Sequence, residues 1–222
     1  MWNRIALSIA VTLVVGAGLF VCMRWVSVEE AVYANLFRLT AEQVTSSLAA
    51  THVQCTTIRT CALLPGDILI RRYITKRTWL FDTLAHPFFT HVAYYVGGDQ
   101  IVEAVGTEKQ SKDDIQVTQL SGSDWFNDDV RTFVIMRPKD SESEVADMSS
   151  ALIRVANDPD YTFGLPEVGH KRTTCADLVY EQLRTEDLVT SRMVPEIITP
   201  DYLYWATRYG SKDFDVLGYS FQ

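Results

Sequence analysis

The stretch that decides the fold is His91–Val105, HVAYYVGGDQIVEAV. Two short runs rich in β-branched and aromatic residues, 91–96 and 101–105, flank the tetrapeptide Gly97-Gly98-Asp99-Gln100. Glycine and aspartate tolerate the backbone conformations that tight hairpin turns require, so this pattern predicts two antiparallel strands. We therefore expect a β-hairpin, and an antiparallel sheet built around it.

Neighbouring segments extend this sheet and supply helices to cover it. Leu64-Pro65-Gly66-Asp67 is typical of a turn, and an aliphatic strand, 68–70, follows it. Further strands are predicted at 117–120, 131–136 and 214–221, with a loop at 124–129, and helices at 26–50, 144–156, 175–184 and 202–209. Thr199 and Pro200 suit the cap and first turn of the last helix. The pattern predicts an α+β fold in which an antiparallel sheet packs against helices.

The N-terminal part has a different character. Ile5–Met23 contains nineteen residues without a charge, and a helix of that length spans about 28 Å, close to the ~30 Å hydrocarbon layer of a bilayer. We expect a transmembrane anchor at 1–25, a helical connector at 26–62 and a catalytic domain at 63–222. A cleaved signal peptide is the alternative, because Arg4 precedes the apolar stretch and small residues occur near Ala34.

Positive charges near the apolar stretch do not set its orientation. Arg4 and the terminal amine lie on one side, and Arg24 and Arg38 lie on the other. By comparison with other single-anchor proteins, we expect a single-pass membrane protein with its catalytic domain outside the cytoplasm. There, Cys55 and Cys61 could close a small disulfide loop, whereas in a reducing compartment they would be ordinary thiols.

Composition excludes several function classes. The formal charge is −8, from 28 acidic and 20 basic residues, and the basic residues form no cluster that would suit nucleic acid. The four histidines do not form a ligand-spaced set with the cysteines, so we expect neither a metal nor a cofactor.

The aromatic segment 79–89 is typical of core packing, with a substrate-binding or membrane-surface lip as the alternative.

Three separated residues form a possible catalytic set. Cys175 begins a predicted helix, where the positive end of the peptide dipoles favours the thiolate, and Thr173 or Thr174 is placed to cap that helix. His91 would take the thiol proton and return it to the leaving group. Glu103 would fix the imidazole and stabilise its protonated form.

The predicted hairpin brings two of these residues together. If Tyr95 faces Ile101, then Ala93 faces Glu103, and His91 lies diagonally opposite Glu103 on the same face of the sheet. A slip of one residue in the register would put the imidazole and the carboxylate on opposite faces. The expected pairing is therefore a geometric test of the catalytic set.

Four motifs then suggest a family: Leu64-Pro65-Gly66-Asp67-Ile68-Leu69, Thr90–Gly97, Val102-Glu103-Ala104 and Thr174–Val179. Together they resemble the permuted NlpC-like branch of papain-fold cysteine enzymes, specifically the YiiX-like group. The cysteine helix follows the histidine strand, which is the circularly permuted order shared with lecithin:retinol acyltransferase-type proteins.

The resemblance covers roughly 63–203. It implies a permuted papain-like fold, with Cys175 as nucleophile, His91 as base and Glu103 as orienting residue. It also suggests that Asp67 and the Asp160-Tyr161 region shape a pocket. Many members carry Ser directly after the cysteine, whereas this chain has Ala176, so the local substrate contacts differ.

Three functions follow from these observations. The first is a membrane-anchored cysteine hydrolase that cleaves an amide in a peptide or cell-wall substrate through an acyl-enzyme. The second is acyl transfer or (thio)ester cleavage on a lipid, suggested by the permuted order, the anchor and Phe88-Phe89 near His91. The third is a catalytically silent ligand-binding domain held at the membrane.

Overall fold

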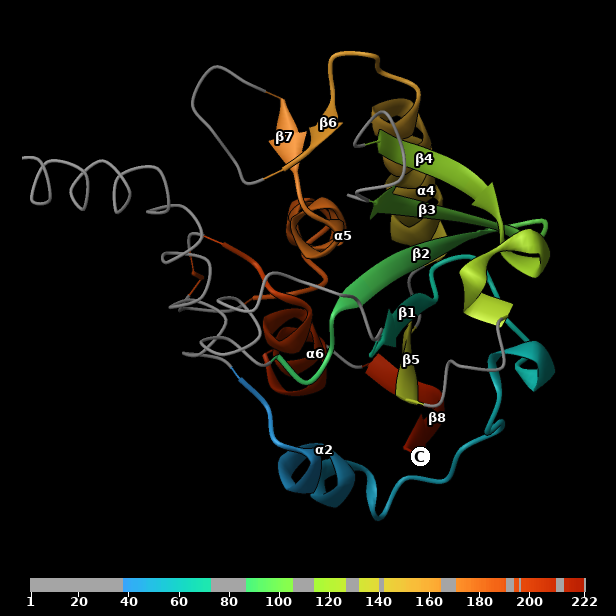
Figure 1. The fold of residues 1–222 in the computed structure, drawn as a ribbon, viewed down its shortest axis with the longest axis vertical. Coiled ribbons are helices and arrows are strands. Elements are labelled where there is room, and N and C mark those ends of the chain that lie inside the picture. The colour runs from blue at the N-terminus through green and yellow to red at the C-terminus, as the bar shows by residue number, and fades with distance from the viewer. Residues whose placement is uncertain are drawn as a thin grey trace, which may run out of the picture.

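The computed structural model describes residues 38–72, 87–105, 114–126, 132–139, 142–164, 171–190, 194–195, 197–210 and 214–221. Their centre is a six-stranded antiparallel sheet in the order β4-β3-β2-β1-β5-β8 (Figure 1). The strands are β1 (Ile68–Arg71), β2 (His91–Gly97), β3 (Gln100–Val105), β4 (Asp114–Gln119), β5 (Thr132–Pro138) and β8 (Phe214–Phe221). A short parallel pair, β6 (Thr162–Phe163) and β7 (Arg172–Thr173), forms a separate two-stranded sheet, and β6 contacts β3 and β4.

Four α-helices of the described chain accompany the sheet. They are α2 (Ala41–Leu48), α4 (Glu142–Ala156), α5 (Cys175–Thr185) and α6 (Pro200–Tyr209). Three single turns of 3-10 helix, η1 (Ile58–Thr60), η2 (Leu120–Gly122) and η3 (Asp124–Phe126), complete the described elements. The predicted α+β class with an antiparallel sheet and covering helices is confirmed.

The hairpin forms as predicted. Gly98 and Asp99 take positive φ angles of 60° and 63°, as a two-residue hairpin turn requires. Tyr95 pairs with Ile101, which is the predicted register, and the bulge between Tyr95 and Gly97 lies beyond that pair. His91 and Glu103 therefore lie on one face of the sheet.

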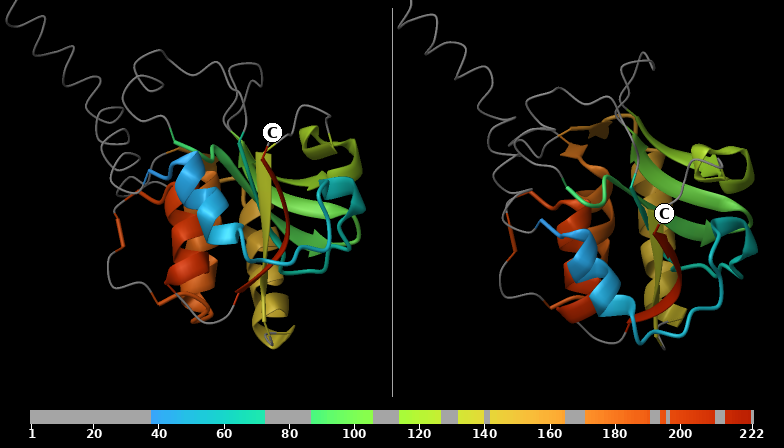
Figure 2. Two further views of the ribbon diagram at one scale, coloured as in Figure 1. Left: turned by 90° about the horizontal axis from the view of Figure 1, so that it is seen from below. Right: turned by 60° about the horizontal axis from the view of Figure 1, so that its bottom comes forward.

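The two faces of the sheet carry different layers. On one face, β1, β2, β3 and β5 contribute to a main cluster that α2, α4, α5 and α6 complete. On the other face, a second cluster joins the sheet to η1, η2 and η3; its buried members include Leu69, Ala93, Ile101, Leu120 and Trp125. Figure 2 shows α2 and α6 on one side of the sheet and the segment containing η1 on the other.

Several helix boundaries depart from prediction. The expected helix 26–50 is wrong over 38–40, where the described chain is not helical; residues 26–37 lie outside the described part. Thr40 starts α2 instead, because its side chain accepts from Gln43 N–H while the Gln43 side chain accepts from Thr40 N–H. The expected loop at 124–129 begins with η3. Thr199 caps α6 and Pro200 opens it, as predicted.

The segment before β1 packs onto the domain. Val44 and Leu48 of α2 are fully buried in the main cluster, and the N–H of Leu39 donates to the Asp201 carboxylate at 3.1 Å. Phe88 and Phe89 are also buried in this cluster, which confirms core packing for that end of the aromatic segment. The rest of the segment up to 86 lies outside the described residues.

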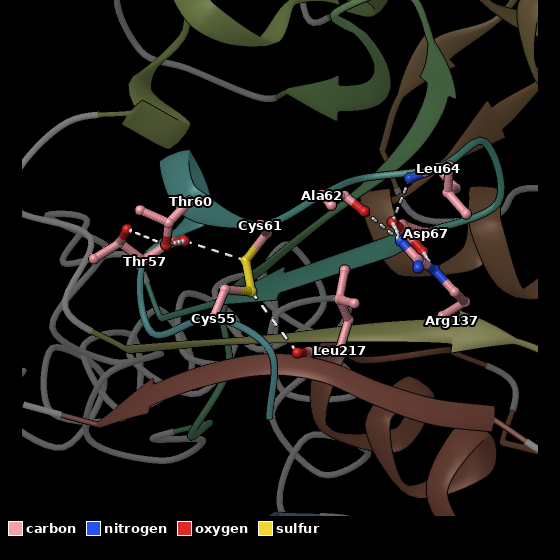
Figure 3. Close-up of a disulfide and its surroundings, with 9 residues drawn as sticks. All are labelled: Cys55, Thr57, Thr60, Cys61, Ala62, Leu64, Asp67, Arg137 and Leu217. Atoms are coloured by element: carbon pink, nitrogen blue, oxygen red, sulfur yellow. Dashed lines mark hydrogen bonds and ion pairs between the residues drawn. A yellow bond between two sulfur atoms is a disulfide. The ribbon is translucent and has the colours of Figure 1, made fainter. Parts of the chain in front are cut away.

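A disulfide closes the loop that carries η1. Cys55 and Cys61 are bonded, with their Cα atoms 5.1 Å apart (Figure 3). The backbone of Cys55 also forms an isolated parallel β-bridge with Gly218 of β8. A Cβ at position 218 would overlap Cys55 Sγ and lie 2.8 Å from the Cys55 carbonyl oxygen, so this close approach requires glycine.

Within the described residues, no helix has both the length and the hydropathy needed to cross a bilayer. The predicted anchor at 1–25 lies outside those residues.

Candidate active site

Cys175 lies at the N-terminus of α5, where the cap holds the first turn. Thr174 is the N-cap: its hydroxyl accepts from the N–H of Asp177 at 3.2 Å and donates to the Asp177 carboxylate at 2.6 Å. The structure thus selects Thr174 of the two predicted caps. Cys175 is a free thiol, only 8% exposed, on a helix that packs against β2 and β3. The amide dipoles of this first turn favour negative charge at the sulfur.

The carboxylate of Asp177 shares this first turn. One oxygen takes the Thr174 hydroxyl, and the other accepts from the N–H of Ile198 at 3.0 Å. Burial raises the pKa of Asp177 to about 6, although these hydrogen bonds oppose the shift. The carboxylate thereby ties the start of α5 to the segment that leads into α6.

His91 bridges the thiol and the carboxylate of the predicted set. Its Nε2 lies 2.8 Å from Glu103 Oε2, and the Cys175 thiol is close enough to raise the pKa of the same imidazole. With Nε2 engaged by Glu103, the nitrogen available to the thiol is Nδ1. The structure therefore brings together the three residues that the sequence selects.

The interactions within the set shift the pKa values of His91 and Glu103 in opposite directions. Burial by itself would lower the pKa of His91, but the interactions of the imidazole with Cys175 and Glu103 raise it to about 9. Burial would raise the pKa of Glu103, but the bond and charge of His91, with smaller contributions from Trp125 and Arg71, lower it to about 2. The geometry favours an imidazolium beside an ionised carboxylate.

Two residues that the sequence analysis did not select complete this environment. Trp125 of η3 donates its indole N–H to Glu103 Oε2 at 3.0 Å. Arg71 is opposite His91 in the register of β1 and β2, and its guanidinium lies 4.1 Å from the centroid of the Trp125 ring. In the sequence, the one signal for Arg71 is its position: it is a charged residue directly after the aliphatic run Ile68–Ile70. No local pattern marks Trp125.

A pocket of about 310 Å³ lies along α5 on the side of the helix that carries Asp177. Arg172, Asp177, Glu181 and Gln182 supply polar walls, and Val155, Tyr161, Thr173, Leu178, Pro195 and Ile198 complete it. Of the Asp160-Tyr161 region, Tyr161 is among the lining residues and Asp160 is not. Because Thr173 and Asp177 flank Cys175 in sequence, the pocket adjoins the first turn of the cysteine helix.

Asp67 is placed elsewhere. It is fully buried in the turn before β1, where it accepts from Leu64 N–H at 2.8 Å and from Arg137 Nε at 2.7 Å and Nη2 at 2.6 Å (Figure 3). Asp67 does not line the pocket beside α5. Its contacts fasten the turn to β5, which is a structural role.

In the part of the chain that the structure describes, no three His, Cys, Asp or Glu side chains gather as ligands for a metal ion. His86 and His170 lie outside that part.

Comparison with known proteins adds no family: no family model matches this chain, and no curated protein matches it at a significant level.

Proposed function

We propose that this protein is a cysteine hydrolase that cleaves an amide bond through an acyl-enzyme on Cys175. The observation that carries the proposal is the shared imidazole: His91 Nε2 lies 2.8 Å from Glu103 Oε2, and the nearby Cys175 helps to raise the pKa of the same imidazole. A buried carboxylate that orients a histidine beside a thiol at a helix N-terminus is the arrangement that activates a cysteine nucleophile. The sequence motifs that resemble YiiX-like enzymes of the permuted papain fold support the same reaction.

Each group has one task in this reaction. The Cys175 thiolate attacks the substrate carbonyl carbon, and the amides at the start of α5 stabilise the oxyanion that forms. The His91 imidazolium then donates its proton to the nitrogen of the leaving amine, and the C–N bond breaks. In the second half, His91 removes a proton from water, which attacks the thioester and releases the acid and Cys175. Glu103 stays ionised throughout and stabilises the imidazolium.

The proposed setting is a membrane surface outside the cytoplasm. The apolar stretch Ile5–Met23 supports an anchor, and the Cys55–Cys61 disulfide suits an oxidising compartment, because cytosolic thiols are normally kept reduced. A peptide or cell-wall amide is then the substrate class that an exported enzyme would meet. Two C-terminal fusions test this orientation: one to a reporter enzyme that is active only outside the cytoplasm, and one to a reporter that is active only inside it. We expect activity from the first fusion, and activity from the second alone would contradict the orientation.

The reaction is tested with full-length protein and a panel of peptide, muropeptide, phospholipid and thioester substrates. We expect amide turnover that Cys175→Ala abolishes, with an acyl group trapped on Cys175 and detected by mass spectrometry of its peptide. A matched control is Cys22→Ala, which removes another cysteine of the chain and keeps both the nucleophile and the disulfide. Amide turnover that survives Cys175→Ala would contradict the proposal.

The same panel separates the alternatives. Turnover of lipid esters or thioesters alone would identify a lipid acyltransferase or esterase, although the burial of Phe88 and Phe89 removes one reason to expect a lipid-facing lip. A silent binding domain would leave Cys175 no more reactive toward acyl probes than Cys22.

A further inference from the structure

We propose that Trp125 is a positioning residue of this site, whose indole N–H holds the Glu103 carboxylate in the orientation that binds His91. The inference rests on the proposed function, because it assumes that Cys175, His91 and Glu103 form a reactive set.

Two donors converge on one oxygen of the carboxylate. His91 Nε2 lies 2.8 Å from Glu103 Oε2, and Trp125 Nε1 donates to the same oxygen at 3.0 Å. The other oxygen, Oε1, accepts from Gln116 at a longer 3.4 Å. The terminal torsion of a glutamate has a broad minimum, so a carboxylate held from one side can rotate. The second donor at Oε2 opposes that rotation.

The indole has little freedom to move. Trp125 is 1% exposed and belongs to the second cluster, with Ala93 and Ile101 of the hairpin. The Arg71 guanidinium lies 4.1 Å from its ring centroid, a cation–π distance, and the His91 ring centroid lies 5.5 Å away. The ring that donates to Glu103 therefore also contacts the imidazole that Glu103 orients.

The backbone of η3 is held from outside the sheet. Trp125 N–H donates to the Ser123 hydroxyl at 3.2 Å. Arg59 donates to the carbonyl oxygen of Phe126 and lies 5.3 Å from its ring centroid. Arg59 is part of η1, inside the loop closed by the Cys55–Cys61 disulfide. This support gives the indole N–H a fixed direction.

The Trp125 indole could instead act only by partly neutralising the charge of Glu103, and this role predicts the opposite effect from positioning. If the indole only reduced the basicity of Glu103, its removal would strengthen the bond from His91 and favour the imidazolium. If the indole positions Glu103, its removal lets the carboxylate turn away and disfavours the imidazolium. The two roles therefore shift the pH dependence of Cys175 reactivity in opposite directions.

The experiment measures the rate at which iodoacetamide alkylates Cys175 in full-length protein in detergent, between about pH 4 and about pH 9. Mass spectrometry of the Cys175 peptide follows this cysteine alone. The test variant is Trp125→Phe, which removes the N–H and keeps an aromatic ring beside Arg71. The matched control is Trp205→Phe, in α6 on the opposite face of the sheet. Both substitutions are repeated in a Glu103→Ala background.

We expect Trp125→Phe to reduce the alkylation rate near neutral pH about tenfold, as the loss of one charge-assisted hydrogen bond would. The acid limb of the pH profile moves to higher pH, and Trp205→Phe leaves rate and profile unchanged. In the Glu103→Ala background, Trp125→Phe changes the rate less than about twofold, because its effect passes through the missing carboxylate.

A second replacement distinguishes the loss of the indole N–H from the loss of packing. Benzothienylalanine at position 125 keeps the shape of tryptophan but carries sulfur in place of the N–H, and we expect it to reproduce the effect of phenylalanine. A wild-type rate and profile in both variants would overturn the positioning role, as would a shift of the acid limb to lower pH. If His91→Ala leaves Cys175 alkylation unchanged in otherwise wild-type protein, the proposed function itself fails.

Discussion

Glu103 Oε2 lies 2.8 Å from Nε2 of His91, although each residue stands on a different strand of the hairpin and neither is directly opposite the other. Ala93 faces Glu103 in this register, so the contact is the diagonal one that same-face residues of adjacent antiparallel strands can make. This pair, together with the influence of Cys175 on the imidazole, raises the pKa of His91 and lowers that of Glu103.

Removing the charge of Glu103 should lower the pKa of His91 toward its ordinary value. Glu103→Gln keeps the size of the side chain but loses the negative charge that helps to raise the pKa of His91 to about 9. We expect the pKa of His91 to fall by roughly one unit or more, as observed by NMR titration of its imidazole protons. Glu181→Gln, an exposed acid on α5, is the control and should leave the titration unchanged. An unaltered His91 titration in Glu103→Gln would contradict the pairing.

The pair also predicts how stability depends on pH. His91 has a raised pKa, from 6.5 to about 9, so its contribution is fully present below pH 6.5 and is lost as pH rises through about 9. Glu103 has a lowered pKa, from 4.5 to about 2, so its contribution is present above pH 4.5 and is lost as pH falls toward 2. The stabilisation is therefore largest between pH 4.5 and 6.5.

Urea denaturation of wild type and His91→Ala across pH measures this dependence. We expect a difference in the free energy of unfolding on the order of 1–3 kcal/mol inside that window, shrinking on both sides. A difference that stays constant with pH would show that His91 contributes packing and no ionic interaction.

Asp67 should matter more for stability than an exposed acid of the same sheet. It is fully buried and takes two hydrogen bonds from Arg137, so Asp67→Ala removes the partner of a partly buried guanidinium. We expect a loss of about 3 kcal/mol in the free energy of unfolding. The matched control is Asp215→Asn, whose pair with Lys139 is exposed and should contribute less than about 1 kcal/mol. Equal losses of unfolding free energy in the two variants would show that the buried Asp67–Arg137 pair stabilises the protein no more than the exposed pair.

The disulfide should stabilise the loop that supports η3. Closing the short loop between Cys55 and Cys61 restricts the unfolded chain, which corresponds to about 2 kcal/mol. We expect the double substitution Cys55→Ser, Cys61→Ser to lower the melting temperature measured by calorimetry. Intact mass of the full-length protein, purified without reductant and then compared with and without it, checks the bond directly. Free thiols at both positions in that protein would exclude it.

Gly218 should be required for the same contact. Gly218→Ala would force a methyl group against Cys55 Sγ and its carbonyl oxygen, whereas nothing lies within 4 Å of a Cβ at Gly122. We expect a lower melting temperature for Gly218→Ala, by an overpacking cost of about 1–3 kcal/mol, and little change for Gly122→Ala. A tolerated alanine at 218 would mean that β8 can move away from the disulfide.

Local patterns predict most of the described elements, because they depend on neighbours in sequence. The Gly98-Asp99 turn sets the hairpin, Thr199 and Pro200 start α6, and the apolar period of 144–156 predicts α4. The start of α2 was missed because Thr40 and Gln43 form a capping box inside a stretch whose apolar spacing continues through it. Periodicity reports a buried face and does not report where a cap interrupts the helix.

By itself, the sequence selected the three residues of the proposed catalytic set and the register of the hairpin. Because side chains alternate between the two faces of a strand, that register puts His91 and Glu103 on the same face. Only the tertiary structure decided that α5 brings Cys175 to the same imidazole, and that Trp125 and Arg71 surround the carboxylate. Those contacts join segments that the chain separates by tens of residues. They arise because a sheet buried on both faces packs helices against one side and the disulfide-closed loop against the other.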